Sequence, residues 1–231
     1  MFEVIRSETR GAANHGWLDA KHTFSFADYH DQDRMGFGSL RVLNEDRIEA
    51  GKGFGTHPHR DMEIVTYIID GALAHKDNMG NGSTIRQGEL QRMTAGTGVL
   101  HSEFNPSDIT THLLQIWIFP ETKGLEPGYE QKFFGRDGKL NQWQILGSRD
   151  GRGGSLTIHQ DIALSATILE AGNSLDYAFE PGRRGFLQMI EGEIRLDDET
   201  LAAGDGVAIS DTTSIRIRAA AESELLLFDM A

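Results

Sequence analysis

Short apolar runs separated by turn-forming residues make up most of this chain. Val, Ile, Leu, Thr and aromatic residues dominate the runs, for example at residues 64–69, 113–119 and 225–228. Glycine and acidic turn signals, such as Asp70-Gly71, separate the runs at intervals of about 8–12 residues. No window sustains the periodicity of an amphipathic helix across several turns. The pattern therefore predicts an all-β fold, either a sandwich or a barrel.

The apolar pattern also repeats within the chain, with a period of about 120 residues. Residues 57–71 align without gaps with residues 178–192, and both segments end in an apolar strand, an acidic residue and a glycine. We therefore expect two tandem copies of one β domain, comprising residues 1–138 and 139–231. The turn-rich, polar segment 120–137 is the expected linker, and residues 147–154 are the alternative boundary.

Composition excludes several classes of protein. The chain has 231 residues and no cysteine, so disulfides and thiolate metal sites are excluded. Its formal net charge of -13 opposes direct binding to nucleic-acid phosphates. The N-terminus lacks a secretory signal, and no apolar run is long enough to cross a membrane. We expect a monomeric cytoplasmic protein that binds neither nucleic acid nor membrane.

Two short motifs bring metal-ligating residue types together. His57 and His59 are two residues apart, as are His101 and Glu103. Residues i and i+2 of a strand face the same side, so these four side chains could meet in one interior. Such a set favours a transition metal, and four ligands would leave coordination positions open for a substrate. Glu63 lies four residues after His59 and is the alternative carboxylate ligand.

Two other interpretations of these histidines remain open. A closed structural zinc site could use four such ligands, although structural zinc sites usually include cysteine. The histidines could also be core residues satisfied by hydrogen bonds, with no metal.

The second copy lacks the candidate ligands. Ala178 and Glu180 replace the two histidines of the first motif, and Arg184 replaces the alternative glutamate. Counted onward from the next shared glycine, Ile217 falls opposite His101. The site is therefore expected only in the N-terminal copy.

The remaining histidines and the N-terminal aromatic residues carry weaker signals. We expect roles in solvent or in turns for three histidines in the polar N-terminal segment: His15, His22 and His30. We expect hydrogen-bonded structural roles for three others: His75, His112 and His159. Three aromatic residues are expected to pack the N-terminal segment rather than line a pocket: Trp17, Phe24 and Phe26.

Residues 51–71 and 88–105 resemble the two sequence motifs of the cupin superfamily, whose fold is a small jelly-roll barrel. Two tandem copies resemble a bicupin, so the resemblance implies two tandem cupin β-barrels. Residues 17–30, 38–46 and 56–63 are similar to the pirin family in particular, and the similarity covers essentially the whole chain. One departure is that the second motif lacks the usual proline before its glycine and is two residues longer than the general cupin pattern.

The resemblance to pirins implies a ligand set, a cofactor and an activity. The implied ligands are His57, His59, His101 and Glu103. They would hold one divalent transition metal ion, which could be Fe, Cu, Ni, Co, Mn or Zn. Some pirins cleave the flavonol quercetin with O2 and release carbon monoxide, so the expected substrates are O2 and a small aromatic molecule. Glu103, or Glu63 if it is not a ligand, would be the general base that takes the flavonol proton.

The resemblance also implies alternatives to this enzyme. Other pirins bind transcription factors, so a non-enzymatic metal or redox sensor with a regulatory protein partner is the alternative function. A cupin isomerase or a sugar-binding module is a third, because fold does not fix function.

Overall fold

Strands joined by short turns run through residues 1–231, all of which the computed structural model describes. The only α-helix is a single turn, α1 (Arg136–Lys139), and short 3-10 turns lie at Ser7–Thr9 and Arg152–Gly154. No helix is long and apolar enough to cross a membrane. The predicted all-β fold is confirmed.

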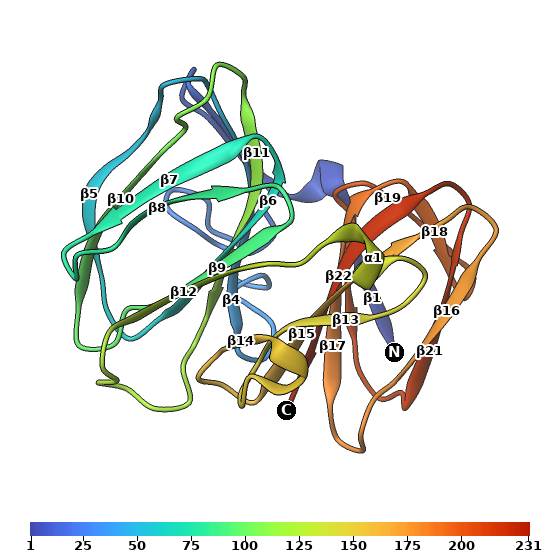
Figure 1. Ribbon diagram of the computed structural model, residues 1–231. Coiled ribbons are helices and arrows are strands. Elements are labelled where there is room, and N and C mark those ends of the chain that lie inside the picture. Colours follow the sequence, from blue (N-terminus) through green and yellow to red (C-terminus); the bar gives the residue numbers. More distant parts are fainter. The chain divides into compact units, whose positions relative to one another are not determined.

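The N-terminal unit comprises residues 11–133 and 156–160. Its strands are β2 (Gly11–Asn14), β3 (Leu18–His22), β4 (Leu40–Ile48), β5 (Gly53–His59), β6 (Glu63–Asp70), β7 (Ala72–Asp77), β8 (Gly82–Arg86), β9 (Glu89–Thr94), β10 (Val99–Phe104), β11 (Thr111–Ile118), β12 (Gly128–Phe133) and β14 (Leu156–Thr157). Two sheets face each other, with the orders β12-β9-β6-β11-β4-β3-β2 and β5-β10-β7-β8 (Figure 1).

Alternating apolar residues of these strands fill one part of the space between the two sheets. One buried cluster of the unit consists of Leu18, Ala20, Ile48, Ile68, Leu73, Ile85 and Leu113. Burial of this cluster stabilises the unit, because apolar surface removed from water contributes roughly 25 cal/mol per Å². The remaining interior space holds the candidate site.

The C-terminal unit comprises residues 1–10, 134–155 and 161–231. Its strands are β1 (Phe2–Ile5), β13 (Gln144–Ser148), β15 (Ile162–Leu169), β16 (Ser174–Ala178), β17 (Arg184–Glu191), β18 (Glu193–Leu196), β19 (Glu199–Ala202), β20 (Gly206–Ile209), β21 (Ser214–Ala219) and β22 (Ser223–Met230). They form the orders β1-β20-β17-β22-β15-β13 and β16-β21-β18-β19.

The strand orders of the two units correspond one to one. The small sheets match as β5-β10-β7-β8 and β16-β21-β18-β19, and the large sheets share the central order β9-β6-β11-β4 and β20-β17-β22-β15. In each unit one further strand extends the large sheet beside β9 or β20. These are β12 and β1, respectively. The internal repeat inferred from the sequence is therefore a repeat of topology.

The segment expected as a linker contains a strand. Residues 120–137 include β12, which pairs with β9 of the N-terminal unit along its whole length. Tyr129 and Gln131 share one side of this strand, but the charged residues Glu130 and Lys132 alternate with them and the strand has no apolar run, so the sequence pattern did not reveal it. The boundary between residues 138 and 139 stays a prediction. The first ten residues group with the C-terminal unit, so a single cut does not describe the two units.

Strand pairing corrects one alignment between the repeats. Ile217 does not correspond to His101, because Ile217 pairs with Leu196 while Glu103 pairs with His75, the residue equivalent to Leu196. Ile217 therefore corresponds to Glu103. Glu103 lies 15 residues after Gly88, whereas Ile217 lies 13 residues after Gly204, and this difference of two residues misplaced the alignment made from sequence alone.

Candidate metal centre

Two neighbouring strands carry the three histidines of the sequence motifs. Strands β5 and β10 pair antiparallel, with His57 directly opposite His101. Alternate residues of a strand share a face, so His59 projects to the same side as these two. The ring centroids of His57 and His101 are 4.4 Å apart, and each lies 4.8 Å from the centroid of His59. The three rings form one cluster able to hold a metal ion.

Glu103 borders this cluster from the same strand. It is 4% exposed, and Val99, His101 and Glu103 form the buried side of β10. Its carboxylate forms a second candidate group with His101 and His75, whose ligand atoms all lie within 4.8 Å of one another. His101 is therefore common to both groups, and the metal-ligand role of Glu103 stays a prediction.

Glu63, the alternative carboxylate, is held elsewhere. Its side chain is fully buried, and its Oε2 lies 3.2 Å from both the backbone N and the ring Nδ1 of His159. Glu63 belongs to neither candidate group. The geometry therefore favours Glu103 as the carboxylate that accompanies the histidines.

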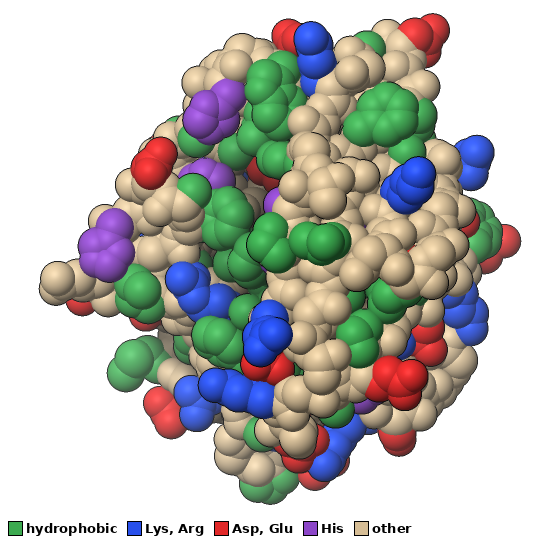
Figure 2. All heavy atoms as spheres, turned by 90° about the vertical axis from the view of Figure 1, so that its left-hand side faces the viewer, with side chains coloured by type: hydrophobic (Ala, Val, Ile, Leu, Met, Phe, Trp, Pro, Cys, Tyr) green, Lys and Arg blue, Asp and Glu red, His purple; other side chains and the backbone are tan.

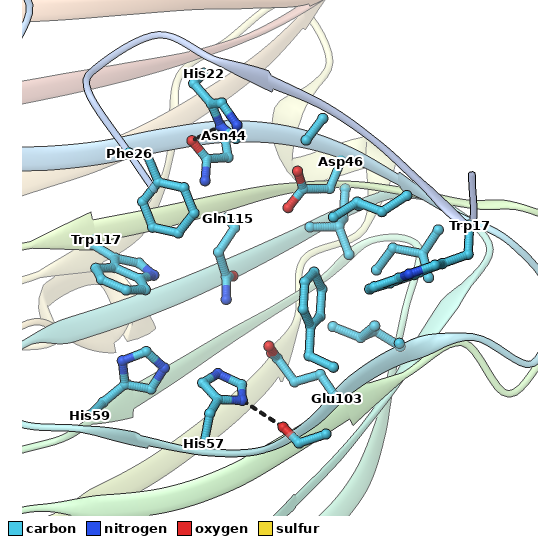
Figure 3. Close-up of a pocket in the computed structure, with 18 residues that line it drawn as sticks. Trp17, His22, Phe26, Asn44, Asp46, His57, His59, Glu103, Gln115 and Trp117 are labelled. Atoms are coloured by element: carbon cyan, nitrogen blue, oxygen red, sulfur yellow. Dashed lines mark hydrogen bonds between the residues drawn. The ribbon is translucent and has the colours of Figure 1, made fainter. Parts of the chain in front are cut away.

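Hydrogen bonds fix which ring nitrogen of His57 is free. Its Nδ1 lies 2.8 Å from the carbonyl oxygen of Gly55, drawn as a dashed line in Figure 3. A carbonyl can only accept, so Nδ1 carries the proton and Nε2 keeps its lone pair. This is the tautomer that binds a metal through Nε2.

A chain of hydrogen bonds fixes His101 in the same way. Asp77 Oδ2 lies 3.0 Å from His75 Nε2, which therefore donates to it. His75 Nδ1 is then the acceptor for His101 Nδ1, 3.4 Å away. The lone pair of His101 is left on Nε2, a buried atom that has no hydrogen-bond partner within the protein. Asp77 thus orients His101 through His75, the usual arrangement behind a metal-binding imidazole.

Burial keeps the imidazoles of His59 and His101 neutral. Burial, and then the neighbouring His57, lowers the pKa of His59 to about 4 and that of His101 to about 3. Both rings are therefore neutral at neutral pH, and each keeps one nitrogen lone pair for a metal ion. Burial raises the pKa of Glu103 to about 7, with a further contribution from Asp46 and an opposing hydrogen bond from Gln115.

The donor set fits a divalent cation. Within the set His57, His59, His101 and Glu103, two buried atoms have no hydrogen-bond partner, His101 Nε2 and Glu103 Oε1. An unsatisfied buried polar atom is costly, and a cation would satisfy both atoms at once. The set contains three imidazoles and no thiolate, a combination that suits borderline transition metals.

A cavity of about 470 Å³ opens beside the histidines, and its side chains are drawn in Figure 3. Its walls are largely apolar and aromatic, with a few polar groups. The lining residues of interest are Trp17, His22, Phe26, Asn44, Asp46, Phe54, His57, His59, Glu103, Gln115 and Trp117. On the face shown in Figure 2, hydrophobic side chains gather beside histidine side chains. The volume of the cavity lies within the range of about 300–1,000 Å³ typical of small-molecule sites.

Three expectations from the sequence were wrong. Trp17 and Phe26 line the cavity instead of only packing the N-terminal segment, and His22 is buried in β3 and bonded to Asn44 rather than solvated. The alternation Leu18, Ala20, His22 was the available signal, because it marks one buried face of a strand. His75 has the expected structural bonds, but its link to His101 was missed.

Comparison with known proteins gives two family matches. The profile described as Pirin matches residues 4–118, and the profile described as Quercetinase C-terminal cupin domain matches residues 145–230. The chain is 47% identical to the quercetin 2,3-dioxygenase of Escherichia coli K12, over all of this chain and 99% of that protein. It is 40% identical to a pirin-like protein of Caulobacter vibrioides, over 96% of each.

A solved structure is also similar over the full length. The crystal structure of a bacterial pirin from Escherichia coli in complex with nickel(II) matches with a TM-score of 0.95 and 46% identity. The match covers 100% of this chain and 99% of that one.

Proposed function

This chain belongs to the pirin family, and from that premise we propose that it is a metal-dependent dioxygenase that cleaves quercetin or a related flavonol with O2, releasing carbon monoxide. The observation that carries the proposal is the cluster of three imidazoles, two of which line a largely apolar cavity. A relative of 47% identity that carries the name quercetin 2,3-dioxygenase supports the choice of reaction.

One divalent transition metal ion would be held by His57, His59, His101 and Glu103. The nickel complex of the related pirin supports nickel as one candidate, with Fe, Cu, Co, Mn and Zn as the others. When bound, such an ion supplies a Lewis acid for substrate oxygens and a centre for O2 chemistry.

The residues of the chain bind and orient the substrate. Trp17, Phe26 and Trp117 give the cavity aromatic walls suited to a flat aromatic molecule, and they exclude water from it. Glu103 would accept the proton of the flavonol hydroxyl, since a carboxyl with a pKa of about 7 is matched to proton transfer near neutral pH. The reaction would then consume one O2 and release one carbon as carbon monoxide.

The test is incubation of metal-loaded protein with quercetin in air and under anaerobic conditions. The proposal predicts loss of the flavonol absorbance only in air, with one carbon monoxide released per quercetin consumed. A Glu103→Gln variant should lose this turnover. Persistence of the flavonol in air with every metal tried would refute the proposal.

The alternative function is a non-enzymatic pirin that senses metal or redox state and binds a regulatory protein. The same experiment separates the two functions. Binding of metal without any turnover of flavonol, together with recovery of a stoichiometric protein partner, would favour the alternative.

A further inference from the structure

Asp46 is a buried carboxyl on the wall of the cavity. It lies on β4 and is 6% exposed, and its carboxylate is directed into the pocket in Figure 3. The residues opposite it on the two adjacent strands are Ala20 of β3 and Leu113 of β11. Neither side chain can form a hydrogen bond. Burial, and then the adjacent Glu45, raise the pKa of this carboxyl, and no hydrogen bond opposes them.

The polar residues one row further along the same sheet are satisfied internally. His22 and Asn44 bond to each other at 2.9 Å, and Thr66 donates to Gln115 at 2.8 Å. These four residues lie opposite one another on β3, β4, β11 and β6. Asp46 therefore differs from its polar neighbours in lacking a partner within the protein.

The C-terminal unit offers an internal comparison. Thr167 is the residue equivalent to Asp46, because it pairs with Leu225 as Asp46 pairs with Leu113. Thr167 is fully buried, and its hydroxyl donates to the carbonyl oxygen of Lys139 at 3.2 Å. An unpartnered carboxyl at this position is thus a feature of the unit that holds the cavity.

We propose that Asp46 accepts a hydrogen bond from a phenolic hydroxyl of the substrate, remote from the part that meets the histidines, and so selects polyhydroxylated flat aromatic molecules. The inference rests on the proposed function. Burying a carboxylate without a hydrogen-bond partner costs free energy. A carboxylate that accepts a hydrogen bond from a hydroxyl group forms a short, strong bond. Asp46 and Glu103 both line the cavity, so the two carboxyls border the same space.

The test compares two flavonols that share the reacting ring but differ in their other hydroxyls. Quercetin carries four further hydroxyls, and 3-hydroxyflavone carries none. Dissociation constants are measured anaerobically on metal-loaded protein, by the change in flavonol absorbance. Asp46→Ala is expected to weaken quercetin binding roughly ten- to hundredfold, as expected for loss of a hydrogen bond to a charged group, and to leave 3-hydroxyflavone binding unchanged.

Two further variants separate recognition from structure. Asp46→Asn keeps a carbonyl acceptor at the same place and should retain part of the preference for quercetin. Glu45→Gln removes a carboxyl from the neighbouring position of β4, where Glu45 bonds to His112, and should leave the preference intact. The metal content of all three variants should equal that of the unmodified protein.

Equal weakening of both flavonols by Asp46→Ala would show a structural role and overturn the inference, as would no change for either. The measurement does not require turnover. A protein that binds quercetin through Asp46 but never consumes it would refute the proposed reaction and leave the recognition role standing.

Discussion

His101 is the residue on which the candidate site depends most. It belongs to both groups of potential ligands, and its free Nε2 is set by the bonds from Asp77 through His75. A substitution of Asp77 should therefore lower the metal affinity although Asp77 is not a ligand. An imidazole in the wrong tautomer presents N–H to the metal rather than a lone pair.

We expect Asp77→Asn and His75→Phe each to lower the affinity for Ni²⁺ or Co²⁺ about 10–100-fold. The measurement is a metal titration, with the visible spectrum of the Co²⁺ form as a second readout of ligand geometry. His112→Phe is the matched control, because this histidine bonds to Glu45 and belongs to neither candidate group. Unchanged metal affinity in both Asp77→Asn and His75→Phe would contradict the role given to Asp77 and His75.

The raised pKa of Glu103 makes metal binding depend on pH. Its pKa of about 7 means that the carboxyl is mostly protonated at pH 6 in metal-free protein and mostly ionised at pH 8. A metal that binds the carboxylate must therefore displace about one proton from it at pH 6 and almost none at pH 8. Affinity should fall as the pH drops below 7.

Calorimetry in buffers of different ionisation enthalpy measures this proton release. The difference between the unmodified protein and Glu103→Gln should be about one proton at pH 6 and should vanish towards pH 8. If the two proteins release the same number of protons at pH 6, Glu103 is not the carboxylate that binds the metal.

At the residue scale, the sequence predicted which side chains lie together where this depends only on the periodicity of a strand. The spacing of His57, His59 and His101 required only that each motif lie on a strand with that face inward. The link of His75 to His101 was missed because it depends on which strands are neighbours, and no single-strand pattern contains that information.

At the scale of elements, the pairing of β5 with β10 aligns the histidines. Gly53 makes this close approach possible. A Cβ atom at this position would lie 2.2 Å from the carbonyl oxygen of Glu103 and 2.4 Å from the Cα of Phe104. Backbone atoms cannot give way as a flexible side chain can, so the strands would have to separate.

Gly53→Ala is therefore expected to destabilise the protein by about 1–3 kcal/mol and to weaken metal binding. Chemical denaturation measures the first effect and metal titration the second. Gly82→Ala is the control within the same sheet, because a Cβ atom there meets nothing within 4 Å. A Gly53 variant as stable as this control, with full metal affinity, would show that the strand pairing does not set the site.

Strand content and the repeat were also predictable at this scale, since both follow from apolar runs and turn signals. The pairing partners were not. The strand β12 and the placement of β1 beside β20 depend on contacts between segments far apart in the chain. The misplaced match of Ile217 had the same origin, because only the strand register reveals the two-residue difference in spacing between the repeats.

At the scale of the whole molecule, the chain carries the same topology twice with different interiors. The positions equivalent to His75, Glu103 and Gln115 are Leu196, Ile217 and Leu227 in the C-terminal unit. All three leucine and isoleucine side chains are fully buried in one apolar cluster. The C-terminal unit therefore has a packed core where the N-terminal unit has a polar site and a cavity.

The central claim is that one chain holds one metal ion, in the N-terminal unit only. The most direct test is the number of metal ions bound per folded chain, measured by elemental analysis for the unmodified protein, His57→Ala and His101→Ala. We predict one ion in the unmodified protein and none in either variant, with both variants folded by circular dichroism. Retention of the ion in both folded variants, or two ions in the unmodified chain, would contradict the claim.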